Sequence, residues 1–209
     1  LSSKSIVIIS RFTNVFLTVL LSALAIYFFV LYLQNGLGLA YNDARSHLDI
    51  GRRVVESLKP GLAQLGSVWL PLTHLFMVPT VWNDFMWHSG LSGSIQSMAG
   101  FVATGLLIYK ILEVLNVGRF GRLVGVIVFV ANLNILYLQS TAMTELPLLA
   151  TMTAGCYYLL VWHRHDRILD LIKAAFWIML STLIRYDGWF LLLFATLLLA
   201  LHTLKKSRY

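Results

Sequence analysis

Six apolar segments alternate with polar ones along the chain, and each predicts a membrane-spanning helix. They run near Phe12–Gln34, Ser92–Leu115, Leu123–Leu138, Glu145–Trp162, Leu171–Ile184 and Trp189–Leu204. A span needs about 20 residues, which the shorter runs reach with their flanks. Lipid offers no partners for backbone polar groups, so spanning runs are helical. We therefore predict an all-α, polytopic helix bundle that forms one transmembrane domain over residues 1–209.

The long polar connection after the first span, residues 36–90, carries two predicted juxtamembrane helices. In Ala44–Leu65 the apolar residues recur at helical spacing, which is typical of a helix lying flat on a membrane. The sequence Lys59-Pro-Gly61 should break this helix in two. The run Gly66–Val81 is apolar, but Pro71 and Pro79 interrupt it. We expect it to form a short juxtamembrane or re-entrant helix, not a span.

The composition supports a membrane protein, because 58% of the 209 residues are hydrophobic and only 12% are charged. A soluble domain carries about a quarter charged residues. The net charge of +7 could suggest nucleic acid, but the basic residues cluster at helix ends, where they act as topological anchors. We expect no nucleic-acid partner. With the N-terminus in the cytoplasm, only five of the sixteen Lys and Arg residues fall outside, namely Arg45, Arg52, Arg53, Lys59 and Arg185.

This orientation places three acidic residues together on the outer face. Asp43 follows the first span, and it is either a general base at the mouth of a cavity or a helix-capping residue. Glu145 opens a helix, where a carboxylate is also favoured by the helix dipole. Asp187 shares a short hairpin with Arg185, which predicts either a local ion pair or an arginine that holds a phosphate.

Other polar residues of the long connection are candidate ligands. Arg52, Arg53 and His74 are candidates to bind a lipid phosphate, and the alternative for the two arginines is a solvated face that touches anionic lipid headgroups. His74 lies in an apolar run and needs a partner. Asp84 and His88, four residues apart, are a weak metal signal, so no metal site is predicted.

Two further patterns concern helix packing. Gly93, Ser97, Gly100 and Thr104 suggest close helix approach. Asn132 and Gln139 are expected to hydrogen-bond between helices.

Four motifs in their order along the chain resemble the GT-C superfamily of polyprenyl-phosphate-dependent glycosyltransferases. The likeness is to the branch of protein O-mannosyltransferases and aminoarabinose transferases. The matching pieces are Tyr41-Asn-Asp-Ala, Gly66-Ser-Val-Trp-Leu-Pro-Leu-Thr-His74, Thr144-Glu-Leu-Pro147 and Arg185-Tyr-Asp-Gly-Trp189.

The resemblance implies that Asp43 is the catalytic acid-base residue and that Glu145 faces the same cavity. Such enzymes pass a sugar from a polyprenyl-phosphate carrier to a protein, glycan or lipid acceptor outside the membrane, commonly with inversion. No cofactor is expected, and nothing in the sequence indicates a divalent metal. The expected location is a bacterial inner membrane, with the N-terminus in the cytoplasm and the active site outside.

Two departures accompany the resemblance. Related enzymes often carry a Lys-Pro-Pro element before the second juxtamembrane helix, whereas this chain has Val68-Trp-Leu-Pro71. Arg52, Arg53, His74 or Arg185 would have to replace that lysine. Family members also have about twice as many spans, so we expect this chain to be the N-terminal, catalytic half of a longer protein.

Two other functions remain open from the sequence. A transporter or flippase half-bundle would use the outer carboxylates as an ion relay, and it predicts discontinuous helices in the membrane. We find no sign of such helices in the sequence. A non-catalytic scaffold subunit would leave Asp43 facing lipid headgroups alone.

Overall fold

The structure is a computed structural model that describes residues 3–65 and 68–206. It is 79% helical and the described residues contain no strand, which confirms the all-α class. The helices are α1 (Ser3–Gln34), α2 (Asn42–Arg53), the 3-10 turn η1 (Leu62–Gln64), α3 (Leu72–Val81), α4 (Asp84–His88), α5 (Leu91–Val114), α6 (Arg119–Val130), α7 (Leu133–Leu138), α8 (Glu145–His165), α9 (Ile168–Ile184) and α10 (Asp187–Lys206).

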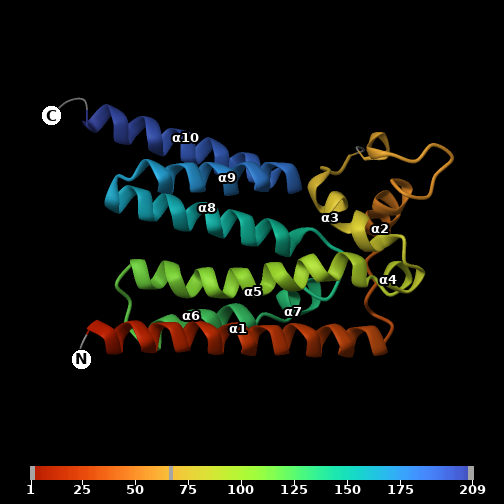
Figure 1. Ribbon diagram of the computed structural model, residues 1–209, viewed down its shortest axis with the longest axis horizontal. Helices are drawn as coiled ribbons and strands as arrows, with labels where there is room; N and C mark the ends of the chain where they lie inside the picture. Colours follow the sequence, from red (N-terminus) through yellow and green to blue (C-terminus); the bar gives the residue numbers. More distant parts are fainter. Residues whose placement is uncertain (1–2, 66–67, 207–209) are drawn as a thin grey trace.

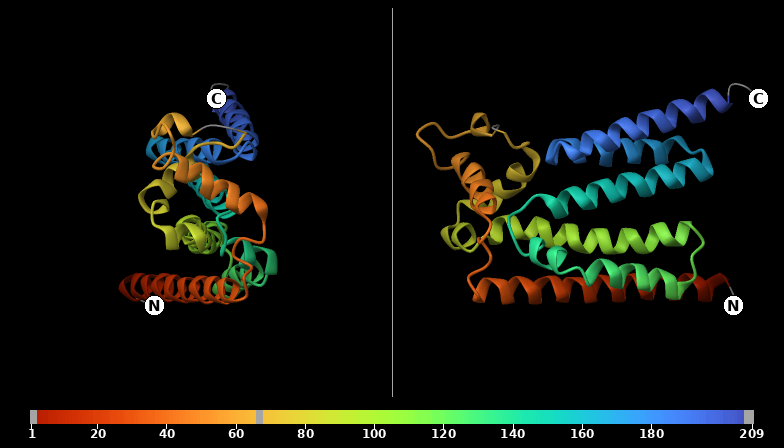
Figure 2. Two further views of the ribbon diagram at one scale, coloured as in Figure 1. Left: turned by 90° about the vertical axis from the view of Figure 1, so that its right-hand side faces the viewer. Right: turned by 180° about the vertical axis from the view of Figure 1, so that it is seen from behind.

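The long helices lie side by side along one axis (Figure 1). α1 packs on α5, α5 on α8, α8 on α9 and α9 on α10, while α6 packs on α5 beside α1 (Figure 2). Successive passes reverse direction, so both described ends of the chain lie at one end of the bundle. α2, α3 and α4 gather at the opposite end, as both views in Figure 2 show. We call this second end the loop end.

Three helical segments are long and apolar enough to cross a membrane: Phe12–Gln34, Leu91–Val114 and Asp187–Lys205. These coincide closely with three of the predicted spans, and they support a membrane protein. The segments Glu145–Trp162 and Leu171–Ile184 are helical, and Leu123–Leu138 is divided between α6 and α7. The crossing of the membrane by these three segments stays a prediction.

The third predicted span is not one continuous helix. α6 ends at Val130, and Asn132 begins α7 by accepting hydrogen bonds from the backbone N–H groups of Asn134 and Ile135. The expectation that Asn132 joins two helices was therefore wrong, because its side chain caps its own helix. Gln139 does join two helices, since its Nε2 donates to the Ala25 carbonyl of α1.

The juxtamembrane predictions hold in part. The first helix ends at Arg53 and not at Lys59, so Leu58 and Leu62 are exposed instead of lining an apolar face. α3 has ten residues, and at 1.5 Å per residue it is far too short to cross about 30 Å of hydrocarbon. The helix is therefore short, as predicted, while its juxtamembrane or re-entrant place stays a prediction; Gly66 and Ser67 lie outside the described residues.

α5 is the central helix, and small residues let it approach its neighbours closely. A Cβ added at Gly93 would lie 2.3 Å from the Cβ of Ala142, and one at Gly100 would lie 2.6 Å from the Leu146 carbonyl oxygen. The predicted close approach at these two glycines is confirmed. The hydroxyls of Ser94 and Ser97 donate to the carbonyls of Ser140 and Met143, each at 3.0 Å. These contacts fix the buried segment that leads into Glu145.

Gly100→Ala should lower the stability of the bundle, because the new methyl group meets backbone atoms that cannot rotate away. Overpacking of this kind costs about 1–3 kcal/mol. The melting temperature of the purified protein in lipid nanodiscs measures the loss. Gly118→Ala is the control, since a Cβ at Gly118 has no heavy atom within 4 Å. Equal melting temperatures for the two variants would contradict the close packing of α5 on α8.

Candidate functional site

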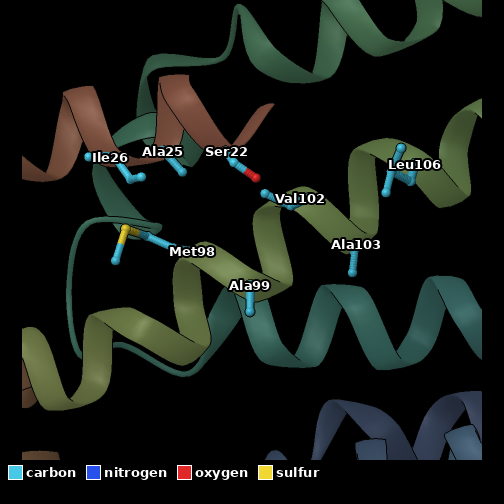
Figure 3. Close-up of a pocket in the computed structure, with 8 residues that line it drawn as sticks. All are labelled: Ser22, Ala25, Ile26, Met98, Ala99, Val102, Ala103 and Leu106. Atoms are coloured by element: carbon cyan, nitrogen blue, oxygen red, sulfur yellow. The ribbon is translucent and has the colours of Figure 1, made fainter. Parts of the chain in front are cut away.

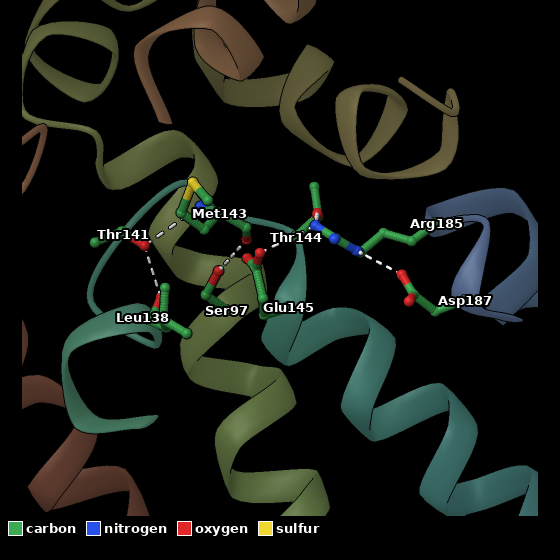
Figure 4. A network of polar contacts seen from close by, with 8 residues as sticks. All are labelled: Ser97, Leu138, Thr141, Met143, Thr144, Glu145, Arg185 and Asp187. Atoms are coloured by element: carbon green, nitrogen blue, oxygen red, sulfur yellow. Dashed lines mark hydrogen bonds and ion pairs between the residues drawn. The ribbon is translucent and has the colours of Figure 1, made fainter. Parts of the chain in front are cut away.

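Arg185 is the centre of an ionic network at the loop end (Figure 4). Its Nη1 donates to Glu145 Oε1 at 3.0 Å and to Thr144 Oγ1 at 3.2 Å. Its Nε donates to Asp187 Oδ2 at 3.1 Å. The network joins the beginning of α8 to the turn between α9 and α10, so it brings together two of the three predicted acids.

The sequence explains this placement locally. Thr144 and Glu145 begin α8 directly after the buried segment that Ser94 and Ser97 hold. On the other side, Arg185 lies in the short turn before Asp187, and Gly188 makes that turn tight. A Cβ at Gly188 would come within 2.4 Å of the Ser181 carbonyl carbon. The turn therefore holds Arg185 and Asp187 at a fixed distance from α8.

A pocket of about 190 Å³ lies beside this network. It is formed by two segments far apart in sequence, one before α3 and one at the α9–α10 turn. Its lining residues are Val68, Trp69, Leu70, Ile184, Arg185, Tyr186 and Asp187. The Tyr186 hydroxyl reaches the Val68 carbonyl oxygen at 3.4 Å, which closes one side. We call this space the rim pocket.

A buried histidine pair lies behind the rim pocket. His47 Nδ1 and His74 Nε2 are 2.8 Å apart and share one hydrogen bond, and both side chains are almost fully buried. The Trp69 ring packs on His47 with 4.7 Å between ring centroids. The pair ties α2 to α3, and it supplies the partner that His74 was expected to need.

Burial lowers the pKa of both histidines to about 4. The positive charge of Arg185 contributes to the lowered pKa of His47, and His47 and Arg53 contribute to the lowered pKa of His74. Both rings are therefore neutral near pH 7. A neutral, enclosed ring does not contact a lipid phosphate, so the predicted phosphate-binding role of His74 finds no support in this geometry.

Asp43 lies in the first turn of α2, exposed, one turn before His47. Residues four apart share a helix face, so Asp43 lies on the side of α2 that carries the histidine pair. Its carboxylate makes no hydrogen bond or ion pair with the residues that the structure describes. It is not a capping residue, because α2 has no side-chain cap.

Arg52 and Arg53 differ in what they contact. Arg52 donates to Glu56 Oε2 at 2.7 Å and to Asp84 Oδ1 at 2.5 Å, and its guanidinium lies 4.1 Å from the Trp87 ring centroid. It is committed to holding α4 against α2. Asp84 is occupied by this ion pair with Arg52, so one of the two residues of the weak metal signal, Asp84 and His88, already has a partner. Arg53 is exposed and has no partner within the described ranges, so it remains a candidate for phosphate.

Reasoning from the sequence missed His47, Trp69 and Tyr186. His47 shares the helical face of Ala44, Leu48 and Gly51, all buried, so the 3.6-residue period could have identified it. Trp69 packs on His47, and Trp87 packs on the guanidinium groups of Arg45 and Arg52. No signal in the sequence places Tyr186 against Val68, because that contact joins distant segments.

Comparisons with known proteins add no assignment: no family model matches the chain, and no curated protein or solved structure is significantly similar to it.

The histidine pair predicts that α2 and α3 separate at mildly acidic pH. In the opened state the histidine pKa returns to about 6.5, so the open state binds more protons between pH 6.5 and 4. Stability of the α2–α3 contact is thus complete above pH 6.5 and is lost as the pH falls toward 4. Hydrogen-exchange protection of the two helices, corrected for intrinsic rates, measures this. Protection that stays constant down to pH 4 would contradict a neutral pair.

The control for this measurement is His163→Gln, at the far end of α8 where the histidine is exposed. It should leave the pH profile of α2 and α3 unchanged. His47→Gln removes one titrating ring, so it should flatten the profile while it lowers protection at pH 7.

Proposed function

We propose that this protein is a membrane glycosyltransferase that moves a sugar from a polyprenyl-phosphate donor to an acceptor on the non-cytoplasmic side. The observation that carries the proposal is the gathering of chemistry at the loop end. A free carboxylate on α2, a pocket beside Arg185, and two further acids converge there from four separate segments of the chain. Structural ion pairs alone would not require the unpaired Asp43.

The reaction follows from these groups. Asp43 takes the proton of an acceptor hydroxyl as that oxygen attacks the anomeric carbon. The bond from the anomeric carbon to the phosphate oxygen breaks, and the electron pair leaves with the phosphate. A single displacement inverts the sugar, through a transition state of oxocarbenium character. Arg53, exposed and without a partner among the described residues, is the candidate cation for the departing phosphate.

An apolar groove supports a lipid-linked donor. A pocket of about 440 Å³ opens between α1 and α5, with Ser22, Ala25 and Ala99 among its lining residues (Figure 3). α1 and α5 are two of the three helices suited to cross a membrane. A hydrocarbon chain in this groove would stay within the lipid layer.

One observation favours a second candidate, a transporter or flippase half-bundle. The break between α6 and α7 is a discontinuous helix, which such proteins use at their transport sites. The break itself was not apparent in the sequence. The break carries Asn132, an uncharged residue, whereas Glu145 and Asp187 lie at helix starts. We therefore favour the transferase.

Asp43→Asn should reduce transfer about 10²-fold or more, the usual contribution of a general base. The assay follows labelled sugar leaving a polyprenyl-phosphate carrier in vesicles that hold the full chain, with cell-envelope extract as the acceptor source. Glu56→Gln is the matched control, because it removes an exposed carboxylate of the same loop and should keep the parent rate. A normal rate in Asp43→Asn, or no transfer by the parent protein, would refute the proposal.

A further inference from the structure

The hydrogen-bonding groups around Arg185 are mixed donors and acceptors. Arg185 has five N–H groups, and the Nη2 pair has no partner among the described residues. Asp187 accepts the Arg185 hydrogen bond with Oδ2, and its Oδ1 has no partner among the described residues. Glu145 Oε2 is buried without a hydrogen-bond partner in the described parts of the chain. A buried, unsatisfied acceptor of this kind calls for a donor.

The charge of the network argues against phosphate. Glu145 and Asp187 share the single positive charge of Arg185, so these three groups together are negative. The two histidines behind them are neutral at pH 7. A phosphate offers only acceptors, and in the pocket it would meet the Asp187 carboxylate, with Glu145 close behind Arg185. A hydroxyl both donates and accepts, so adjacent hydroxyls in the pocket satisfy Arg185 Nη2 and the free carboxylate oxygen of Asp187 together.

The shape of the rim pocket agrees with a single ring. Its volume of about 190 Å³ is below the roughly 300–1,000 Å³ of pockets that hold drug-sized ligands. Two aromatic residues line it, Trp69 from the segment before α3 and Tyr186 from the α9–α10 turn. The negative face of an aromatic ring attracts the partly positive C–H groups of a saturated sugar ring.

We infer that the rim pocket binds an uncharged, hydroxyl-bearing sugar ring, with Asp187 and Arg185 as hydrogen-bonding residues and Trp69 as the packing surface. The inference rests on the proposed function, in which that ring is the sugar of the donor. It replaces the expectation that Arg185 holds the phosphate, and it leaves that role to Arg53.

The experiment is a titration of the full chain in nanodiscs with methyl hexopyranosides and, separately, with inorganic phosphate. Calorimetry should detect binding of the glycosides at millimolar concentration, and it should detect no binding of phosphate. Asp187→Asn and Trp69→Phe should each weaken glycoside binding by about tenfold or more, as the loss of one good contact does. Glu56→Gln should bind like the parent protein. Melting temperatures show whether each variant is folded.

Several results would overturn the inference. If the parent protein bound phosphate and Asp187→Asn bound it more tightly, the ligand of the pocket would be an anion. Glycoside binding that is absent, or unchanged in both folded pocket variants, would exclude the sugar. Asp43→Asn separates this inference from the function: it should bind glycoside normally while it loses transfer. If the parent protein bound no glycoside but still transferred sugar in a reaction that needs Asp43, the assignment of the rim pocket would be rejected. The proposed transferase function would stand.

Discussion

Arg185 joins two segments that are far apart in the sequence, the start of α8 and the turn between α9 and α10. A single guanidinium bonds the start of α8 through Thr144 and Glu145, and the start of α10 through Asp187. The side chains of Arg185 and Glu145 are 38% and 32% exposed, so the pair is partly removed from water and its attraction is less screened than on an open surface. The rim pocket and the field felt by His47 both depend on this placement.

The loop end combines a rigid layer with a free carboxylate. Tight contacts of α5 with the segment before α8 fix Glu145, and the His47–His74 bond fixes α2 against α3. Asp43 extends from this fixed α2 without a partner of its own among the described residues. An acid–base group needs such freedom to exchange protons with a ligand, while the groups that orient the ligand need rigidity.

Much of the fold was readable from apolar run lengths, and much of the site was not. The runs located all six long segments because each exceeds the length of an ordinary loop, and proline-interrupted Leu72–Val81 was correctly kept short. The break at Asn132 was missed because its neighbours Val130 and Leu133 continue the apolar pattern. The ion network was suggested by the shared membrane side of Glu145 and Arg185. Their direct bond, and the burial of His74, depend on contacts between distant segments that no local pattern records.

The central claim is that six alternating passes gather Asp43, Glu145 and Arg185 at one membrane face. Single cysteines in a Cys156→Ser background test it, with an impermeant thiol reagent applied to intact cells. Cysteines at Ser57, Asn83 and Tyr186 should all react from outside, whereas those at Gly118 and Asp166 should react only after the membrane is opened. Labelling of Tyr186Cys and Ser57Cys from opposite sides would separate the α9–α10 turn from α2 and contradict the account.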